Sequence, residues 1–202
     1  MTRIGVLVSG GGTNLQALID NEKAGKIPHG KICLVVASND KAYALERAAK
    51  AGIPSAAVRR KDYSDQDAYD EALVSVLKEH DIEMVILAGF LSILGPRFIQ
   101  AYPDRIINIH PALIPSFCGK GYYGLKVHEA ALAKGVKVTG ATVHLVNEIP
   151  DGGRILLQKA VEVQDGDTPE ILQRRVMEQA EWILLPKAAE MLAEMIEEEK
   201  QS

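Results

Sequence analysis

Three side chains, Asn108, His110 and Asp151, have the types needed to carry acyl transfer without a metal or a covalent nucleophile. The two-residue period of a strand puts Asn108 and His110 on one face, and Ile107 and Ile109 on the other. An amide and a protonated imidazole can donate to the oxyanion of a tetrahedral intermediate. A carboxylate beside that imidazole would hold it charged and help to move protons. The pattern therefore predicts an acyl-transfer site.

The placement of this pair along the chain also suggests a ligand site. Pro111 favours extended backbone at His110, so a strand is expected to end with His110 at its carboxyl edge. Open α/β sheets bind their ligands at that edge. Two structural readings remain open: a satisfied polar pair at a strand end, and a simple turn at Asp151-Gly152-Gly153.

No strong nucleophile accompanies the pair. Ser116 and Cys118 follow a few residues later in a glycine-rich loop, and Cys118 is interpreted as a bystander. Direct transfer between two bound substrates is therefore favoured over a covalent intermediate.

A glycine-rich segment, Ser9-Gly10-Gly11-Gly12-Thr13-Asn14, follows the first predicted strand and opens the first predicted helix. Glycines there let backbone N–H groups approach a phosphate at the helix amino terminus, and Thr13 and Asn14 can add side-chain donors. The segment lacks the spaced glycines of a dinucleotide fingerprint and the Lys-Ser/Thr of a Walker A loop. Phosphate binding is the leading interpretation, with a tight strand-to-helix turn as the alternative.

The composition is that of one soluble globular unit. The chain has 202 residues, 47% hydrophobic and 25% charged, so we expect a single domain over 1–202, with a phosphate-binding half (1–100) and a catalytic half (101–202). A net charge of -4 and no dense basic stripe argue against nucleic-acid binding. Two distant cysteines argue against a metal site or a disulfide framework, and no apolar run reaches about 18 residues. We expect a cytoplasmic protein with small-molecule substrates, either a monomer or a homodimer.

Strand-like and helix-like segments alternate over the first two thirds of the chain, which predicts a mostly parallel, doubly wound (Rossmann-like) α/β sheet. An antiparallel ribbon and a long C-terminal helix, bent at Pro186, are expected to follow. The predicted strands are 4–8, 32–37, 55–58, 84–88, 106–109, 139–146 and 154–163, and the predicted helices are 14–24, 42–51, 65–79, 96–101, 125–134 and 169–195.

Several of these segments resemble the folate-dependent phosphoribosylglycinamide formyltransferases of purine biosynthesis, in the family's order and over nearly the whole chain. The segments are Val8 to Ala17, Leu87-Ala88-Gly89-Phe90-Leu91, Asn108 to Phe117, Gly140-Ala141-Thr142-Val143-His144, Asp151-Gly152-Gly153 and Ile155-Leu156-Leu157-Gln158. The resemblance implies transfer of a formyl group from 10-formyltetrahydrofolate to the amine of glycinamide ribonucleotide, with no metal. It assigns the phosphate to Gly11, Gly12, Thr13 and Asn14, and catalysis to Asn108, His110 and Asp151. It also implies that the half over 1–100 binds the nucleotide and that the half over 101–202 binds the folate.

The resemblance also implies roles for residues that the pattern alone would treat as structural. His144 matches a histidine that orients the catalytic groups, and Glu181, which the pattern places on the surface, matches an acid that reaches the substrate amine or ribose. Leu91, Ser92, Ile93 and Leu94 match the wall that holds the pterin, with Asn108 beside it. Ile114-Pro115 matches a cis peptide.

Four features depart from the family. Ser92 stands where arginine is common, and Trp182 stands where histidine is usual. Gln66 falls where an arginine often meets the glutamate tail of folate, and Arg59, Arg60 or Lys61 are candidates to replace it. The loop over 117–125 is longer and richer in glycine than the family's loop, which is typical of a mobile lid.

Three alternatives remain. Methionyl-tRNA formyltransferase and formyltetrahydrofolate deformylase use the same type of trio, but each carries an additional domain that we do not expect here. A non-catalytic nucleotide sensor would use the glycine-rich segment alone, and it would tolerate replacement of Asn108 and His110.

Overall fold

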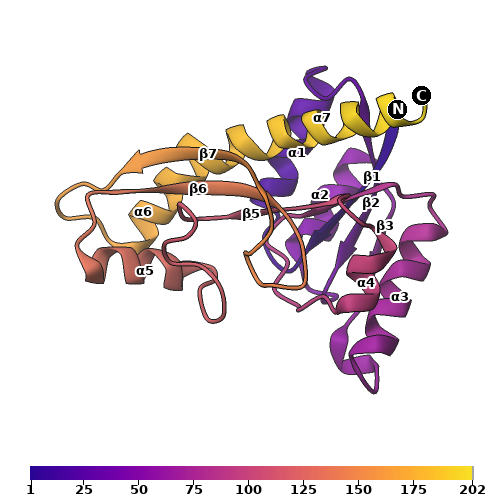
Figure 1. The fold of residues 1–202 in the computed structure, drawn as a ribbon, viewed down its shortest axis with the longest axis horizontal. Helices are drawn as coiled ribbons and strands as arrows, with labels where there is room; N and C mark the ends of the chain where they lie inside the picture. Colours follow the sequence, from indigo (N-terminus) through magenta and orange to yellow (C-terminus); the bar gives the residue numbers. More distant parts are fainter. Residues whose placement is uncertain (202) are drawn as a thin grey trace.

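A seven-stranded sheet in the order β3-β2-β1-β4-β5-β6-β7 forms the centre of the protein (Figure 1). We describe residues 1–201 from a computed structural model. The first five strands are parallel, and β6 and β7 are antiparallel to their neighbours, as the sequence predicts. The strands are β1 (Thr2–Val8), β2 (Gly30–Ala37), β3 (Ser55–Ala57), β4 (Met84–Leu87), β5 (Ile106–His110), β6 (Val138–Leu145) and β7 (Ile155–Glu162).

Helices cover both faces of this sheet because its central strands are apolar on both faces. One apolar cluster joins the sheet to α1, α2, α6 and α7, and a second joins it to α3 and α4. The helices are α1 (Thr13–Lys23), α2 (Tyr43–Ala51), α3 (Gln66–Lys78), α4 (Pro96–Ala101), α5 (Leu125–Lys134), α6 (Pro169–Val176) and α7 (Trp182–Glu199), with a 3-10 turn, η1 (Arg60–Asp62), and a π-helical turn, η2 (Met177–Glu181).

The strand order reverses direction between β1 and β4. From β1 the chain winds outward to β2 and β3, then returns to β4 on the other side of β1. The loops that leave the carboxyl ends of β1 and β4 therefore diverge, and open α/β sheets place their ligands in the resulting crevice. The two loops here are the glycine-rich segment and 88–94.

The C-terminal helical region differs from the single helix bent at Pro186 that the sequence suggests. The α-helix is interrupted earlier, by the π-helical turn η2, and Pro186 lies inside α7. The buried residues Leu172, Val176, Ala180 and Leu184 follow a period of four. In a regular α-helix, residues spaced by four would turn progressively away from the sheet, because this spacing exceeds one helical turn. The π-helical turn contains more residues than an α-helical turn, so it keeps these side chains facing the sheet. This insertion also changes which side chains after it are buried.

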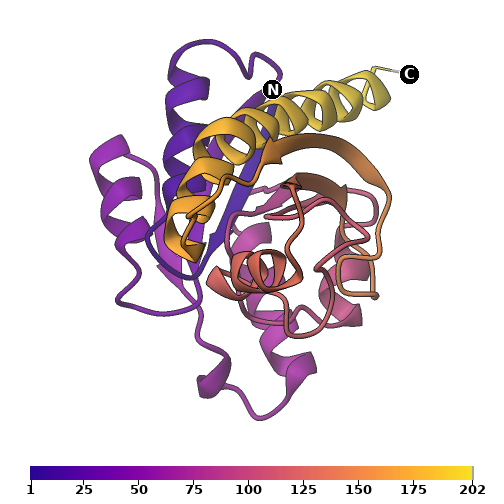
Figure 2. The same cartoon turned by 90° about the vertical axis from the view of Figure 1, so that its left-hand side faces the viewer.

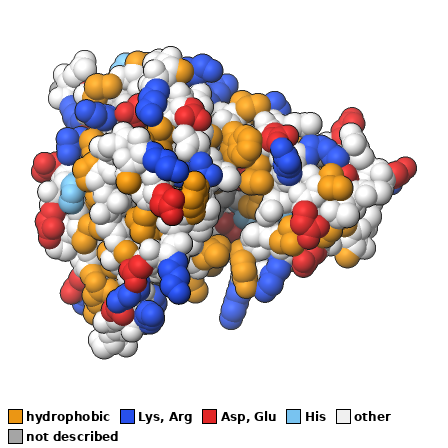
Figure 3. Space-filling model, turned by 180° about the vertical axis from the view of Figure 1, so that it is seen from behind, with side chains coloured by type: hydrophobic (Ala, Val, Ile, Leu, Met, Phe, Trp, Pro, Cys, Tyr) orange, Lys and Arg blue, Asp and Glu red, His pale blue; other side chains and the backbone are white. Residues whose placement is uncertain are grey.

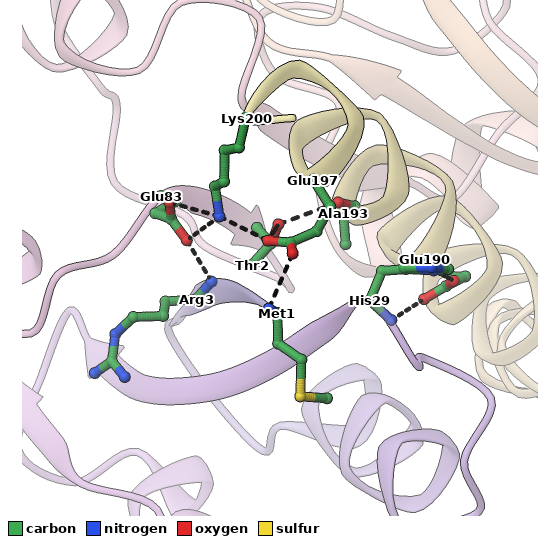
Figure 4. A network of polar contacts seen from close by, with 9 residues as sticks. All are labelled: Met1, Thr2, Arg3, His29, Glu83, Glu190, Ala193, Glu197 and Lys200. Carbon is green, nitrogen blue, oxygen red and sulfur yellow. Dashed lines mark hydrogen bonds and ion pairs between the residues drawn. The ribbon is translucent and has the colours of Figure 1, made fainter. Parts of the chain in front are cut away.

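A polar network fastens the far end of α7 to the sheet (Figure 4). Glu197 accepts hydrogen bonds from the Met1 amine (3.0 Å) and the Thr2 hydroxyl (3.2 Å). Lys200 pairs with both Glu197 and Glu83. These contacts lie at the amino ends of β1 and β4, so they anchor the long helix at the edge of the sheet opposite the glycine-rich segment.

The molecule is wide at one end and narrow at the other. The narrow part holds α5, α6 and the outer ends of β6 and β7, while α7 runs across the sheet toward the wide part (Figures 1 and 2). Seen from behind, a hollow separates the two parts (Figure 3). No helix within residues 1–201 has the length and apolar character needed to span a membrane.

Candidate active site

Asn108 and His110, at the end of β5, line a cavity of about 370 Å³. Asp151 lines the same cavity. Ile107 and Ile109 point into the apolar cluster beneath α1 and α7, so the period-two alternation holds. The strand ends at His110, as Pro111 predicts. The structure therefore brings together the three residues that the sequence singles out.

Asn108 is oriented by a short chain of hydrogen bonds on the neighbouring strand. His144 lies opposite it on β6, and its Nδ1 donates to the carbonyl oxygen of Leu145 (2.8 Å). Because a carbonyl cannot donate, Nδ1 carries a proton, and when it is the only ring proton, Nε2 accepts an N–H from the Asn108 amide (3.1 Å). The second N–H of that amide has no partner within residues 1–201 and is available to a ligand.

His110 is held from two sides. Its Nε2 donates to the carbonyl oxygen of Phe117 (2.8 Å), and its Nδ1 lies 3.6 Å from Asp151 Oδ2. That second distance exceeds a hydrogen bond, so the contact is electrostatic. Asp151 Oδ2 instead accepts the N–H of Gly119 (2.8 Å), and Asp151 Oδ1 lies 3.5 Å from His144 Nε2. The loop after Phe117 thus closes over both catalytic candidates.

Burial and charge act on the pKa of His110 in opposite directions. Burial lowers the pKa of His110 below its ordinary value, although Asp151 and the Phe117 carbonyl act to raise it. Burial pushes the pKa of Asp151 upward, but His144, the Gly119 N–H and His110 outweigh it, and the pKa falls below its ordinary value. Asp151 thus acts in the expected direction, toward a charged His110, but burial acts against it, and the expectation that Asp151 keeps His110 charged stays a prediction.

The glycine-rich segment leads into α1 as predicted. Gly12 has a φ of 71°, in the left-handed region, and an added Cβ would lie 2.7 Å from the Cβ of Ala44 on α2. Both constraints favour glycine. Gly10 and Asn14 line the same cavity as His110, whereas Thr13 lines a separate cavity of about 320 Å³ on the outer side of α1.

Asn14 and Glu181 form a buried polar pair at the wall of the catalytic cavity. The amide of Asn14 donates to Glu181 (2.7 Å), and the Oδ1 of Asn14 has no partner within residues 1–201. Burial raises the pKa of Glu181 to about 7, against the Asn14 hydrogen bond, which lowers it. The pattern-based surface assignment of Glu181 is therefore wrong, because η2 turns this side chain inward, where it is 6% exposed.

A second, more apolar cavity of about 220 Å³ adjoins the first. Its lining includes Leu91, Ser92, Ile93 and Leu94, and it shares Asn108 and Asp151 with the first cavity. Leu91 and Ile93 are 62% and 78% exposed, which is unusual for large apolar side chains and indicates a face that a planar apolar ligand would cover.

Two hydrogen bonds fix the loop that carries this apolar wall. Ser9 Oγ accepts the N–H of Leu91 (2.8 Å), and the amide of Gln66 donates to the carbonyl oxygen of Ile93 (3.0 Å) and to Asp70 (2.7 Å). Gln66 thus supports the wall from behind and does not line the cavity. Among the candidates to replace the missing arginine, Arg59 is paired with Asp40 and Asp62.

Sequence reasoning missed several groups of this site. The Phe117 carbonyl and the Gly119 N–H are backbone atoms that no sequence pattern marks. His128 on α5 lines the catalytic cavity, is fully buried, and has no hydrogen-bond partner at either ring nitrogen within residues 1–201. Burial and the nearby His110 lower its pKa to about 4. Its ring is therefore neutral near pH 7.

Two expectations for the segment over 114–118 agree with the structure. The Ile114-Pro115 bond is cis, as expected. Burial, followed by the charge of Asp151, raises the pKa of the Cys118 thiol, and its Sγ contacts the Pro115 carbonyl oxygen at 3.3 Å. A thiol that stays protonated is a weak nucleophile, which agrees with its interpretation as a bystander.

Comparison with known proteins identifies the family. A model of the formyl transferase family matches residues 2–188. Phosphoribosylglycinamide formyltransferase of Haemophilus influenzae is 41% identical over 179 residues, which cover 89% of this chain and 82% of that protein. The human trifunctional purine biosynthetic protein adenosine-3 is 42% identical over 191 residues, 95% of this chain but 18% of that protein. The chain thus spans less than a fifth of the length of its trifunctional relatives.

Solved structures give the same result. Glycinamide ribonucleotide transformylase 1 of Symbiobacterium toebii superposes with a TM-score of 0.90 at 42% identity, covering 96% of this chain and 88% of that one. The corresponding enzyme of Geobacillus kaustophilus gives 0.88 at 36% identity, covering 96% and 99%. With the family model spanning nearly all of the sequence, the chain belongs to the formyl transferase family.

Proposed function

We propose that this protein transfers the formyl group of 10-formyltetrahydrofolate to the amine of glycinamide ribonucleotide, giving formylglycinamide ribonucleotide and tetrahydrofolate. The observation that carries the proposal is the junction of two cavities of different character at Asn108 and Asp151. An enzyme that joins two bound reactants without a covalent intermediate needs such a junction. The names of the relatives supply the acceptor and the transferred group, and the formyl transferase family implies the folate donor.

The larger cavity suits the nucleotide. It begins at the glycine-rich segment, where a phosphate would meet the amino terminus of α1. On the same wall, Glu181 and Asn14 form a buried polar pair that can bind ribose hydroxyls or the glycinamide amine. A substrate anchored at its phosphate and ribose would extend its amine toward His110. Gly11, Gly12 and Thr13 would complete the phosphate site.

The smaller cavity suits the pterin of the folate. The exposed side chains of Leu91 and Ile93 offer apolar contact to a flat ring, and the backbone of 91–94 offers hydrogen bonds to its edge. Ser92 in place of arginine would reduce folate affinity little, because the backbone of 91–94 would make the hydrogen bonds to the ring. The bound folate would supply a formyl group on a nitrogen that can leave.

Asn108 and His110 divide the chemistry between them. The free N–H of the Asn108 amide would stabilise the negative charge that develops on the formyl oxygen. His110 Nδ1 carries the lone pair, because Nε2 donates to Phe117, and it would take the proton that the attacking amine sheds. The resulting imidazolium would be stabilised by Asp151 and would give its proton to the departing folate nitrogen. The net result is one proton moved from the amine to the folate.

The test mixes the purified protein with glycinamide ribonucleotide and 10-formyltetrahydrofolate, or a dideaza analogue, and follows folate absorbance with and without the nucleotide. We expect loss of the formyl group only when the nucleotide is present. Equal loss without it would indicate a hydrolase of the deformylase type. Nucleotide binding with no turnover would indicate a sensing module.

We further propose that the protein acts in the cytoplasm on these two small molecules, as one catalytic unit, either a monomer or a homodimer. The net charge of -4 and the lack of a basic stripe support small-molecule substrates over nucleic acid. Fractionation of cells and sedimentation of the purified protein test the location and the assembly state.

A further inference from the structure

Three successive carbonyl groups of the glycine-rich segment are held from the side of α2. The Ser9 carbonyl accepts the side-chain amide of Asn39 (2.8 Å) and the Gly10 carbonyl accepts the backbone N–H of Ala44 (3.1 Å). The Gly11 carbonyl accepts Nε of Arg47 (2.7 Å). Three residues that follow β2 or lie in α2 therefore hold one side of the glycine-rich segment: Asn39, Ala44 and Arg47.

The hydrogen bonds to these carbonyl groups also fix the direction of the N–H on the other side of each peptide group. In a trans peptide the C=O of one residue and the N–H of the next point in opposite directions. Carbonyls drawn toward α2 therefore turn the N–H groups of Gly10, Gly11 and Gly12 away from it. None of these three N–H groups meets an acceptor within residues 1–201.

Successive N–H groups that point to one side form a concave anion site, and here they continue into the open amino terminus of α1. A second observation points to a ligand at this place. Asn14 is 8% exposed, lines the cavity, and leaves its Oδ1 without a partner within residues 1–201. Because this oxygen only accepts, its partner would be a donor beside the phosphate, such as a ribose hydroxyl of the nucleotide. Gly10, at the other end of the segment, lines the same cavity.

We infer that Asn39 and Arg47 are positioning residues, which act through the carbonyls of Ser9 and Gly11 to aim backbone N–H groups at the phosphate of the substrate. The inference rests on the proposed function. Neither side chain needs to touch the phosphate, because each acts on the far side of a peptide group.

The segment needs such support because glycine peptides rotate at little cost. Without partners for their carbonyls, the Gly10 and Gly11 peptides would sample orientations that present an oxygen to the phosphate. Arg47 is itself held, since its guanidinium donates to Gln16 (3.0 Å) and lies over the ring of Tyr43 (5.0 Å). Asn39 is held by the N–H of Lys41, which donates to its Oδ1 (3.0 Å). Both donors are therefore fixed in place.

The test compares kcat/KM for glycinamide ribonucleotide with kcat/KM for the same compound lacking its phosphate. In Arg47→Met we expect the ratio of the two to fall about tenfold or more, because a charge-assisted hydrogen bond that orders the site is lost. Turnover of the phosphate-free compound and KM for the folate should change little. A general loss of folding would reduce both activities equally and leave the ratio unchanged.

Two further variants separate the possible causes. Lys50→Met removes a cation from the same helix without touching a loop carbonyl, so a fall equal to that of Arg47→Met would overturn the inference in favour of long-range charge. Asn39→Ala removes the second donor independently and should lower the ratio in the same direction. An unchanged ratio in both Arg47→Met and Asn39→Ala, with normal turnover of the phosphate-free compound showing that both variants fold, would also overturn the inference. A wild-type protein with no preference for the phosphorylated compound would instead refute the proposed phosphate site itself.

Discussion

The Nε2 of His110 lies 2.8 Å from the carbonyl oxygen of Phe117, and this contact decides which nitrogen of the ring can react. A carbonyl oxygen only accepts, so Nε2 carries the proton of the neutral ring and Nδ1 carries the lone pair. Nδ1 is also the nitrogen nearer to Asp151. The backbone of the loop thus sets the state in which the histidine can act as a base.

Replacement of the catalytic pair should reduce turnover far more than binding. We expect His110→Ala to lower kcat by about a thousandfold, within the usual range for loss of a general acid–base group, and Asp151→Asn by somewhat less. KM for both substrates should stay within a fewfold of the wild type. Steady-state kinetics with circular dichroism as a folding control test this, and near-normal rates in both variants would refute the mechanism.

The decrease of kcat/KM at acid pH should report the protonation of His110. Because burial lowers the pKa of this ring below 6.5, kcat/KM should be flat near neutral pH and fall only below pH 6.5. The charge of Asp151 raises that pKa, so Asp151→Asn should move the decrease to still lower pH. A decrease with its midpoint above 6.5 in the wild type, or a shift to higher pH in the variant, would contradict this assignment.

Glu181 should make the ligand-free protein less stable as pH rises. Its pKa is raised from 4.5 to about 7 in the folded state, so the folded state holds the proton more tightly than the unfolded state. The stabilisation is complete below pH 4.5 and is lost as pH rises through 7, to a total of about 3 kcal/mol. Urea unfolding at several pH values measures the loss.

The matched variant for this test is Glu181→Gln, which keeps the shape and an acceptor for Asn14 but cannot ionise. Its free energy of unfolding should lack the decrease between pH 4.5 and 7, and it should exceed that of the wild type at pH 8. If the two proteins show the same pH dependence, Glu181 is not the group responsible. Substrate affinity should fall in the variant if Glu181 contacts the nucleotide.

Gly12→Ala should destabilise the fold, whereas Gly10→Ala should not. At Gly12 a side chain meets both a left-handed φ and the Cβ of Ala44 at 2.7 Å, and the backbone term alone costs about 1–2 kcal/mol. A Cβ at Gly10 would have no neighbour within 4 Å. Denaturant unfolding of both variants checks the difference, and equal stabilities would show that α2 yields to the added methyl group.

Local patterns predicted most of the sheet and the placement of the trio. The alternation in 106–110 and Pro111 located the end of β5, and the family resemblance, now confirmed by the formyl transferase match, led to the cis bond before Pro115. These features depend on neighbouring residues in the sequence. The roles assigned to the site residues remain predictions.

The errors concern features that depend on three-dimensional packing. The last helix was expected to run unbroken to a bend at Pro186, yet the π-helical turn η2 interrupts it earlier, and Pro186 lies inside α7. The same turn buries Glu181. The lowered pKa of His110 depends on how deeply the folded protein buries the ring, which no short sequence pattern encodes.

Ser9 joins the two halves of the site through atoms of a single residue. Its carbonyl belongs to the glycine-rich segment of the proposed phosphate site, and its hydroxyl accepts the N–H of Leu91 on the apolar wall. The spacing between the two cavities is therefore built into adjacent strands of one sheet. Folding would establish the relative placement of the two reactants before either binds, and the entropy otherwise lost in aligning them would already have been spent.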